Sequence, residues 1–312
     1  MTLVVGYAPD GRSRAALHLA GALARSAGED LVVCAVVPVA WPPGPARVDA
    51  EYRDHLERTA REAFEEARAR LPADVHADFV VEHARSAPAG LLDVAAAREA
   101  EAIVVGSSSG GALGRVSLGS ASDRLVHSAP IPVAMTPSGY RCPPDARVTR
   151  VTAAFGGAEG ADDLVVAAAG LAARFGASLR LVSFAVRPRP PYTAGVGRIG
   201  DEAAVDEWVE AIRAAADAAL ADVREHVPHA PDDLDAVIGH GETWDEAIDD
   251  VEWDDGDLLV VGSSSIGPLR RVFLGSRASK IVRRSPVPVA VVPRGAAAEL
   301  ADRVVHDEES RR

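Results

Sequence analysis

The segment at residues 103–137 reads IVVGSSSGGALGRVSLGSASDRLVHSAPIPVAMTP, and the segment at residues 259–293 reads LVVGSSSIGPLRRVFLGSRASKIVRRSPVPVAVVP. Gly106 is equivalent to Gly262, at an offset of 262 − 106 = 156 residues. The same offset, without a gap, relates Gly119 to Gly275, Ser120 to Ser276, Pro130 to Pro286 and Pro137 to Pro293. A repeat of about half the chain length indicates a duplicated domain rather than a solenoid of short units.

Apolar runs and helical stretches alternate along each half of the chain. In the first half, strands are predicted at 3–7, 31–39, 75–82, 102–105 and 131–135, with helices at 13–26, 50–71, 87–100 and from 120. The second half repeats the order, with strands at 148–155, 179–186, 234–238 and 257–261 and helices at 161–175, 201–226 and 243–251. Strands that are almost entirely Val, Ile and Leu indicate a parallel sheet covered by helices on both faces.

We therefore predict an α/β chain of two doubly wound, open parallel-sheet domains in tandem. The first domain is expected over residues 1–139 and the second over residues 148–294. The linker at 140–147 contains Pro143-Pro144-Asp145. The tail at 295–312 is rich in alanine and then charged, which predicts a frayed helix or disorder.

The last strand of each half carries prolines, at Pro130 and Pro132 and at Pro286 and Pro288. Because proline has no N–H to donate, it is tolerated at an edge strand or at the start of a strand. An apolar edge strand is an aggregation risk unless another strand pairs with it. We therefore expect the two last strands to pair with each other across a pseudo-twofold axis.

Composition excludes several classes of protein. The formal net charge of −13 at pH 7 argues against broad binding to nucleic acid or to anionic membranes. No apolar run approaches the roughly 20 residues of a membrane span, and the N-terminus lacks a signal peptide's basic region and cleavage site. Cys34 and Cys142 are the only cysteines. A cytoplasmic location without a disulfide framework is therefore expected.

Glycine and serine residues follow the fourth strand of each half, at Gly106, Ser107, Ser109 and Gly110 and at Gly262, Ser263 and Ser265. The pairs Gly119-Ser120 and Gly275-Ser276 then open the next helices. Ligands of open α/β sheets bind at the carboxyl ends of the strands, and a helix N-terminus favours an anion. This pattern predicts a site for phosphate groups.

The roles of individual residues stay open at this level. Ser120 and Ser276 are expected either to bind a phosphate oxygen or to cap their own helices. Arg115 and Arg271, four residues before each Gly-Ser pair, either neutralise phosphate charge or are solvated loop residues.

Two common nucleotide motifs are absent. A P-loop needs Gly-Lys-Ser/Thr, and the single lysine, Lys280, follows Ser279. A dinucleotide fingerprint needs its glycines in the turn after the first strand, and neither 6–11 nor 155–160 has that spacing.

On these residues each half resembles a universal stress protein domain, and the chain resembles the tandem, actinobacterial-type members of that family. The family's ATP signature is Gly, two residues, Gly, nine residues, Gly-Ser/Thr; its second glycine is Ser109 in the first half and Ser265 in the second. The family's aspartate after the first strand is replaced by Ala8, with Asp10 nearby, and by Gly156-Gly157 in the second half.

The resemblance implies a 3-2-1-4-5 strand order and pairing of the halves through the fifth strands. It also implies ATP as ligand, with Mg²⁺ as the nucleotide's counter-ion. Adenosine is expected between the tips of the first two strands, beside Ala8, Asp10 and Val37.

Other polar residues have plainer explanations. His83 and His240 end the third strand of each half, where a ligand contact is less common than an ordinary strand-end histidine. The acidic residues around Trp253 suit a solvated helix end better than a metal; they are Asp249, Asp250, Asp254 and Asp255. Neither a nucleophile elbow nor a zinc spacing occurs, and no catalytic constellation is found.

Two functions from different classes follow. The first is a stress-response sensor or regulator that binds an adenine nucleotide. The second is a scaffold that no longer binds nucleotide and contacts a regulatory protein partner, which Ser109, Ser265 and Ala8 favour. A slow ATPase ranks third, because no positioned base is evident. Pairing of the halves makes the chain an intrachain pseudo-dimer, and a further homodimer is left open.

Overall fold

A computed structural model describes residues 2–8, 13–39, 46–108, 110–157, 161–187, 198–263 and 274–306. Within these residues a single open sheet has the order β3-β2-β1-β4-β5-β10-β9-β6-β7-β8. Read outward from the junction, each half follows 5-4-1-2-3. The strand order predicted from the resemblance is confirmed in both halves.

The first repeat comprises β1–β5 and the second β6–β10. Elements of the first repeat are β1 (Thr2–Gly6), α1 (Arg14–Ala27), β2 (Asp30–Pro38), α2 (Ala46–Arg70), β3 (Ala77–Ala84), α3 (Ala87–Ala97), β4 (Ala102–Val105), α4 (Ser120–Ser128) and β5 (Val133–Met135). The second repeat has β6 (Arg150–Ala154), α5 (Ala161–Phe175), β7 (Ser178–Val186), α6 (Arg198–His226), β8 (Leu234–Gly241), α7 (Trp244–Asp249), β9 (Asp257–Gly262), α8 (Ser276–Arg284), β10 (Val289–Val292) and the final helix α9 (Arg294–His306).

The repeats join through their fifth strands. Strands β5 and β10 pair antiparallel, with Ala290 opposite Ala134, whereas all other neighbours in the sheet are parallel. Because these alanines are equivalent residues, the pseudo-twofold axis passes close to this pair. Each proline before a fifth strand contributes its carbonyl: Pro132 accepts from Ile103 and Pro288 from Leu259, both at 2.9 Å. The predicted pairing of edge strands is confirmed.

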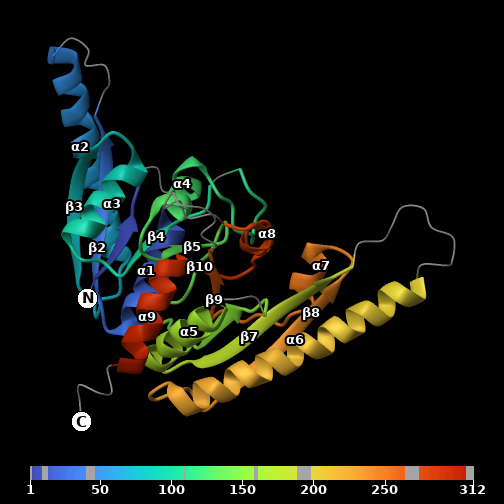
Figure 1. Cartoon of the computed structure of the whole chain (residues 1–312). Coiled ribbons are helices and arrows are strands. Elements are labelled where there is room, and N and C mark those ends of the chain that lie inside the picture. The colour runs from blue at the N-terminus through green and yellow to red at the C-terminus, as the bar shows by residue number, and fades with distance from the viewer. Residues whose placement is uncertain are drawn as a thin grey trace.

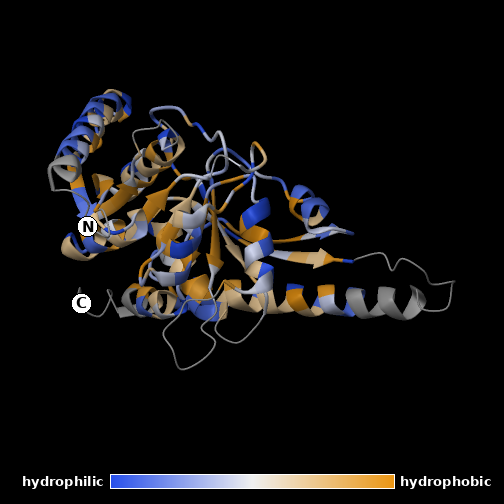
Figure 2. Cartoon of the chain, turned by 90° about the horizontal axis from the view of Figure 1, so that it is seen from above, coloured by the Kyte–Doolittle hydropathy of each residue, from blue (hydrophilic) through white to orange (hydrophobic). Residues whose placement is uncertain are grey.

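Helices cover both faces of the sheet (Figure 1). Alternate strand residues divide the core, so that Val5 belongs to the cluster under α1, α2, α5, α6 and α9. Its neighbour Val4 belongs to the cluster under α3, α4, α7 and α8. Figure 2 shows the hydrophobic residues concentrated on the strands, with mixed hydropathy on the helices. The doubly wound prediction is confirmed.

The C-terminal segment differs from the frayed or disordered tail expected from composition. Residues of α9 dock on α5, burying Ala296, Ala297 and Ala301 to below 10% exposure. Gly170 permits the close approach, because a Cβ atom there would lie 2.1 Å from Cγ2 of Val304. Composition alone could not show this, since the apolar face of α9 is mostly alanine and the glycine that receives it is 134 residues earlier (304 − 170).

Candidate functional site

In the described part of the first repeat, the residues predicted to bind phosphate follow β4, and the predicted adenosine contacts lie at the ends of β1 and β2. Strand β1 pairs with β2 on one side and β4 on the other, with Val5 opposite both Val33 and Val104. Helix α1, which follows β1, packs on one face of the sheet, and α4, which follows β4, packs on the other. The two connections therefore diverge between β1 and β4, which is the switch point where open α/β sheets bind ligands.

Hydrogen bonds from serine hydroxyls fix the loop after β4. Oγ of Ser107 donates to the carbonyl of Thr136 at 2.5 Å and accepts from the amide of Ser117 at 2.8 Å. The amide of Ser108 donates to the carbonyl of Ser117 at 2.9 Å, and the two hydroxyls lie 2.7 Å apart. Gly111 is required here, because a Cβ atom would lie 2.2 Å from Cβ of Ser117. Sequence reasoning missed Ser108, Ser117 and Thr136, whose roles depend on folding of the loop.

Helix α4 begins at this loop with an exposed serine. Gly119 is its N-cap, and the amide of Gly119 donates to Oγ of Ser122 at 2.8 Å. Gly119 also packs closely, since a Cβ atom there would lie 3.0 Å from Cβ of Ser108. The capping hydroxyl is thus that of Ser122, which leaves the hydroxyl of Ser120, the first helical residue, exposed and outside the cap. Two roles were predicted for Ser120, phosphate binding and helix capping, and this geometry does not favour helix capping.

Two predicted adenosine contacts lie at the same edge. Ala8 is exposed just after β1, and its amide donates to Oγ of Ser13 at 2.8 Å. Val37, near the end of β2, is 3% exposed. Tyr7 beside them is buried, and burial, with a smaller contribution from Glu66, raises the pKa of its phenol, which therefore stays protonated at neutral pH. Asp10 and Ser109 lie outside the described residues.

Arg115 is held by the second repeat. Its guanidinium donates to the carbonyl of Arg284, the last residue of α8, at 2.7 Å and to Oδ1 of Asp249, the last residue of α7, at 2.6 Å. The side chains of Arg115 and Asp249 are 26% and 55% exposed. The structure therefore places Arg115 in a contact between the repeats. This contact is different from both roles expected from the sequence, which were phosphate ligand and solvated loop residue.

The equivalent loop of the second repeat is described only at its ends. Gly262 ends β9, and Ser263 is 7% exposed, its amide donating to the carbonyl of Val292 at 2.9 Å. Gly275 is the N-cap of α8 and Ser276 is exposed. The position equivalent to the capping Ser122 is Ala278. Gly110 of the first loop is exposed, and Gly106 is partly buried. Ser265 and Arg271 lie outside the described residues.

The strand-end histidines and the acidic cluster are engaged in ordinary contacts. His83 lies 2.9 Å from a carboxylate oxygen of Glu57, and the amide of His240 donates to Asp250 at 2.9 Å. Asp254 pairs with Arg150 at 2.9 Å. Within the described parts of the chain no three metal-ligating side chains come together. Nor does any helix in those parts have the length and apolar character to cross a membrane.

Comparison with known proteins gives one consistent result. The model of the Universal stress protein family matches residues 1–137 and 148–293. A curated universal stress protein of Mycobacterium tuberculosis is 40% identical over 299 residues, which cover 94% of this chain and 100% of that protein. A universal stress protein of Mycobacterium bovis matches with the same identity and coverage.

Solved structures agree on the fold. A universal stress protein from Archaeoglobus fulgidus covers 94% of this chain and 98% of its own, with a TM-score of 0.55 at 17% identity. A protein described as a putative universal stress protein from Pseudomonas aeruginosa covers 96% of each chain, with a TM-score of 0.53 at 16% identity.

Proposed function

The chain belongs to the universal stress protein family, and on that premise we propose that it is a stress-response regulator whose first repeat binds an adenine nucleotide. The ligand is ATP, with Mg²⁺ as its counter-ion. Phosphates would contact the Gly106–Ser107 and Gly110 backbone and the start of α4 at Gly119 and Ser120. Adenosine would lie against Ala8 and Val37, between the tips of β1 and β2.

The start of α4 carries the proposal. Three features favour an anion there: the unbonded N–H groups of a helix's first turn, the positive end of the helix dipole and the exposed hydroxyl of Ser120. Asp123 is the acidic residue of this turn, and its amide is already bonded to the carbonyl of Gly119 at 2.8 Å. Because it is Oγ of Ser122 that accepts from the amide of the N-cap Gly119, the exposed hydroxyl of Ser120 is available to a phosphate oxygen.

The second repeat supports nucleotide binding less well. Gly156 and Gly157 occupy the place of Ala8, and Gly157 has a left-handed backbone with φ of 62°. Ser276 and Gly275 repeat the helix start, but no serine stands at the capping position. We therefore propose one nucleotide per chain, in the first repeat.

Calorimetric titration of the full chain with ATP and Mg²⁺ tests this proposal. A stoichiometry near one is expected, and Ser120→Asp is expected to abolish the heat because a carboxylate would repel the phosphates. Ser128→Asp is the matched control, since it adds the same charge at the exposed far end of α4. Equal binding by both variants, or no heat at millimolar ATP with the wild-type chain, would reject the proposal.

Arg115 favours a second candidate, a scaffold without nucleotide. Its guanidinium, which belongs to the loop between β4 and α4, is committed to Asp249 and to the carbonyl of Arg284. On this alternative the loop joins the two repeats and presents a surface to a protein partner. Failure of ATP to bind, together with a loss of stability in Arg115→Ala, would favour the scaffold over the nucleotide site.

A further inference from the structure

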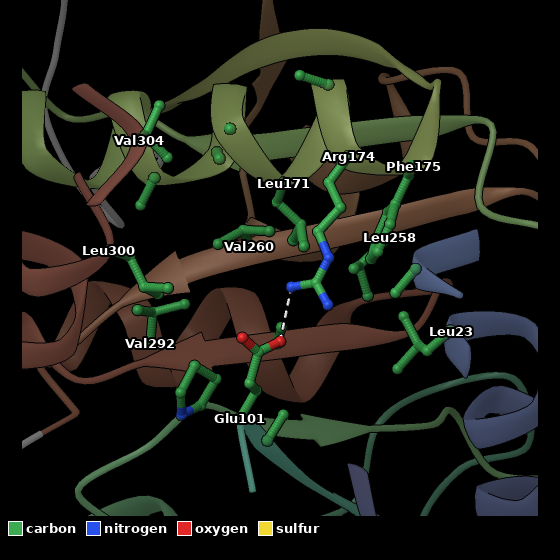
Figure 3. Close-up of a pocket in the computed structure, with 18 of the residues that line it drawn as sticks. Leu23, Glu101, Leu171, Arg174, Phe175, Leu258, Val260, Val292, Leu300 and Val304 are labelled. Carbon is green, nitrogen blue, oxygen red and sulfur yellow. Dashed lines mark hydrogen bonds and ion pairs between the residues drawn. The ribbon is translucent and has the colours of Figure 1, made fainter. Parts of the chain in front are cut away.

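A cavity of about 470 Å³ lies between the repeats on the face of the sheet covered by α1, α5 and α9. Its floor is formed by β4, β5, β9 and β10, so it spans the pseudo-twofold junction. Figure 3 shows Leu171 and Phe175 of α5, Leu300 and Val304 of α9, and Leu23 of α1 gathered around the cavity together with Val260 and Val292 of the sheet.

Small residues create this space. Ala134 and Ala290 lie opposite each other at the centre of the sheet, and α5 contributes Ala167, Ala168, Gly170 and Ala173. Interiors are normally packed with few voids larger than a water molecule, and an apolar void gives water no hydrogen-bond partners. A volume of this size falls within the roughly 300–1,000 Å³ of small-molecule sites.

Among the residues that the structure describes, the rim offers no uncompensated arginine or lysine. Arg174 is the arginine of the lining, and its guanidinium binds Glu101 at 2.6 Å and also Glu29. The carboxylates are well shielded, with side chains 18% exposed for Glu101 and 7% for Glu29. The two carboxylates together outweigh the charge of the guanidinium that they share. This group of side chains therefore repels an anionic head group more than it attracts one. The exposed His229, also in the lining, follows α6.

The lining is also too deep for a protein partner. Ala134, Leu258 and Val260 are each 2% exposed, so that a second folded surface laid over the opening would not reach them. A small molecule between the helices therefore fits this lining better than a folded partner does.

We propose that this cavity binds an uncharged aliphatic molecule, such as a medium-chain alcohol, whose chain lies along β5 and β10 beneath α9. The site is separate from the carboxyl end of β4, so this inference stands without the nucleotide proposal. A ligand there contacts both repeats and α9 together, which stabilises their association.

Fluorescence titration of the full chain with N-phenyl-1-naphthylamine, an uncharged apolar dye, tests the site. Saturable one-to-one binding is expected, with dodecan-1-ol displacing the dye at lower concentration than dodecanoate. The order of the two competitors tests the charge argument separately, because they share the same chain. An absence of saturable dye binding, or tighter binding of dodecanoate, would overturn the proposal.

Variants that fill the cavity test whether the dye binds there. Ala173→Phe places a ring in the cavity and is expected to weaken dye binding by about tenfold or more, since a filled interior has no room for a ligand. Leu300→Trp fills the space from α9 instead, and serves if Ala173→Phe does not fold. Ala97→Phe is the matched control, because Ala97 is exposed on α3, on the opposite face of the sheet. Unchanged dye affinity in a folded cavity variant would overturn the assignment.

Discussion

At the scale of single residues, Asp257 shows how a buried charge is compensated. Its side chain has no exposure and accepts hydrogen bonds from Nε of Arg150 at 2.5 Å and from the amide of Asp254 at 2.9 Å. Nη2 of Arg180 lies 3.4 Å away, and the side chain of Arg180 is itself 5% exposed. Burial lowers the pKa of Arg180, and Asp257 acts in the opposite direction. Buried ions without a partner are strongly destabilising.

Removing this carboxylate should therefore be costly. Asp257→Ala leaves the buried Arg180 guanidinium with the uncharged oxygens of Thr152 and Glu252 but without its carboxylate partner, and we expect the free energy of unfolding to fall by about 3–5 kcal/mol. Urea denaturation followed by circular dichroism measures the loss. Asp254→Ala is the control, because that side chain is 65% exposed and its pair with Arg150 should contribute at most about 1 kcal/mol. Equal losses in the two variants would contradict the assignment of Asp257 as the central charge.

The lowered pKa of His18 in α1 leads us to expect that the stability of the chain depends on pH. Burial first, and then the positive charges of Arg70 and Arg141, lower the pKa of its imidazole in the folded chain below the usual 6.5, against a backbone hydrogen bond at Cys142. The unfolded chain then binds a proton more readily than the folded chain as the pH falls below 6.5. Stability should therefore decrease as the pH falls through this window.

His18→Gln isolates that contribution from other titrating groups. The loss of unfolding free energy between pH 8 and pH 5 should be smaller in the variant than in the wild-type chain, as measured by chemical denaturation at each pH. An identical loss in both chains would show that His18 does not titrate differently on folding.

At the scale of elements, much of the fold follows from the sequence. Runs rich in Val, Ile and Leu mark β1, β2, β4, β7, β9 and β10, whereas β5 and β6 are short and contain alanine. The prolines before β5 and β10 indicate the strands that pair. The observed ends of some elements differ by a few residues from the predicted ends where the side-chain pattern does not mark a boundary. Helix α3 ends at Ala97 rather than at Ala100, because Glu99 adopts a left-handed backbone with φ of 48°.

The features of the candidate site that the sequence did not predict depend on contacts between residues far apart in the chain or on the folding of the loop. Arg115 meets Asp249 across 134 residues of chain, and no local pattern indicates such a pair. The loop serines were recognised as a group, but Ser122 was not recognised as the capping residue of α4, since a glycine occupies the usual place of a capping side chain. The place of the Gly-Ser pair at the start of α4, in contrast, follows from the repeat itself.

Docking of α9 on α5 predicts the effect of changing one glycine. Gly170→Leu would drive a side chain into Val304, whose Cγ2 already lies 2.1 Å from the position of a Cβ atom. We expect α9 to detach, with faster amide hydrogen exchange across residues 294–306 and little change in the strands. Gly295→Leu is the control, because a Cβ atom there has nothing within 4 Å. Unchanged exchange in α9 of the Gly170 variant would contradict the docking.

At the scale of the whole molecule, the continuous sheet couples the repeats. Strands β5 and β10 contribute three paired residues each, centred on Ala134 and Ala290, and Arg283 of α8 lies 3.8 Å from Asp123 of α4. Because the pairing is antiparallel, the carboxyl edge of the first repeat lies beside the amino edge of the second. The carboxyl ends of β4 and β9, which the two candidate ligand loops follow, therefore point to opposite edges of the sheet, and Arg115 bridges from one repeat to the other.

This coupling predicts a single unfolding transition. We expect one calorimetric peak for the wild-type chain and two for Ala290→Asp, because an unpaired carboxylate at a residue only 7% exposed would disrupt the junction. Ala97→Asp, at an exposed helical residue, should keep one peak. Two separate peaks for the wild-type chain would show that the repeats unfold independently.

The nucleotide site of the first repeat is tested most directly by a crystal structure of the full chain grown with ATP and Mg²⁺. We expect nucleotide phosphates within hydrogen-bond distance of the Gly119 and Ser120 backbone and of Oγ of Ser120, with adenosine beside Ala8 and Val37. Nucleotide bound elsewhere on the molecule, or an empty loop at saturating ATP, would contradict it.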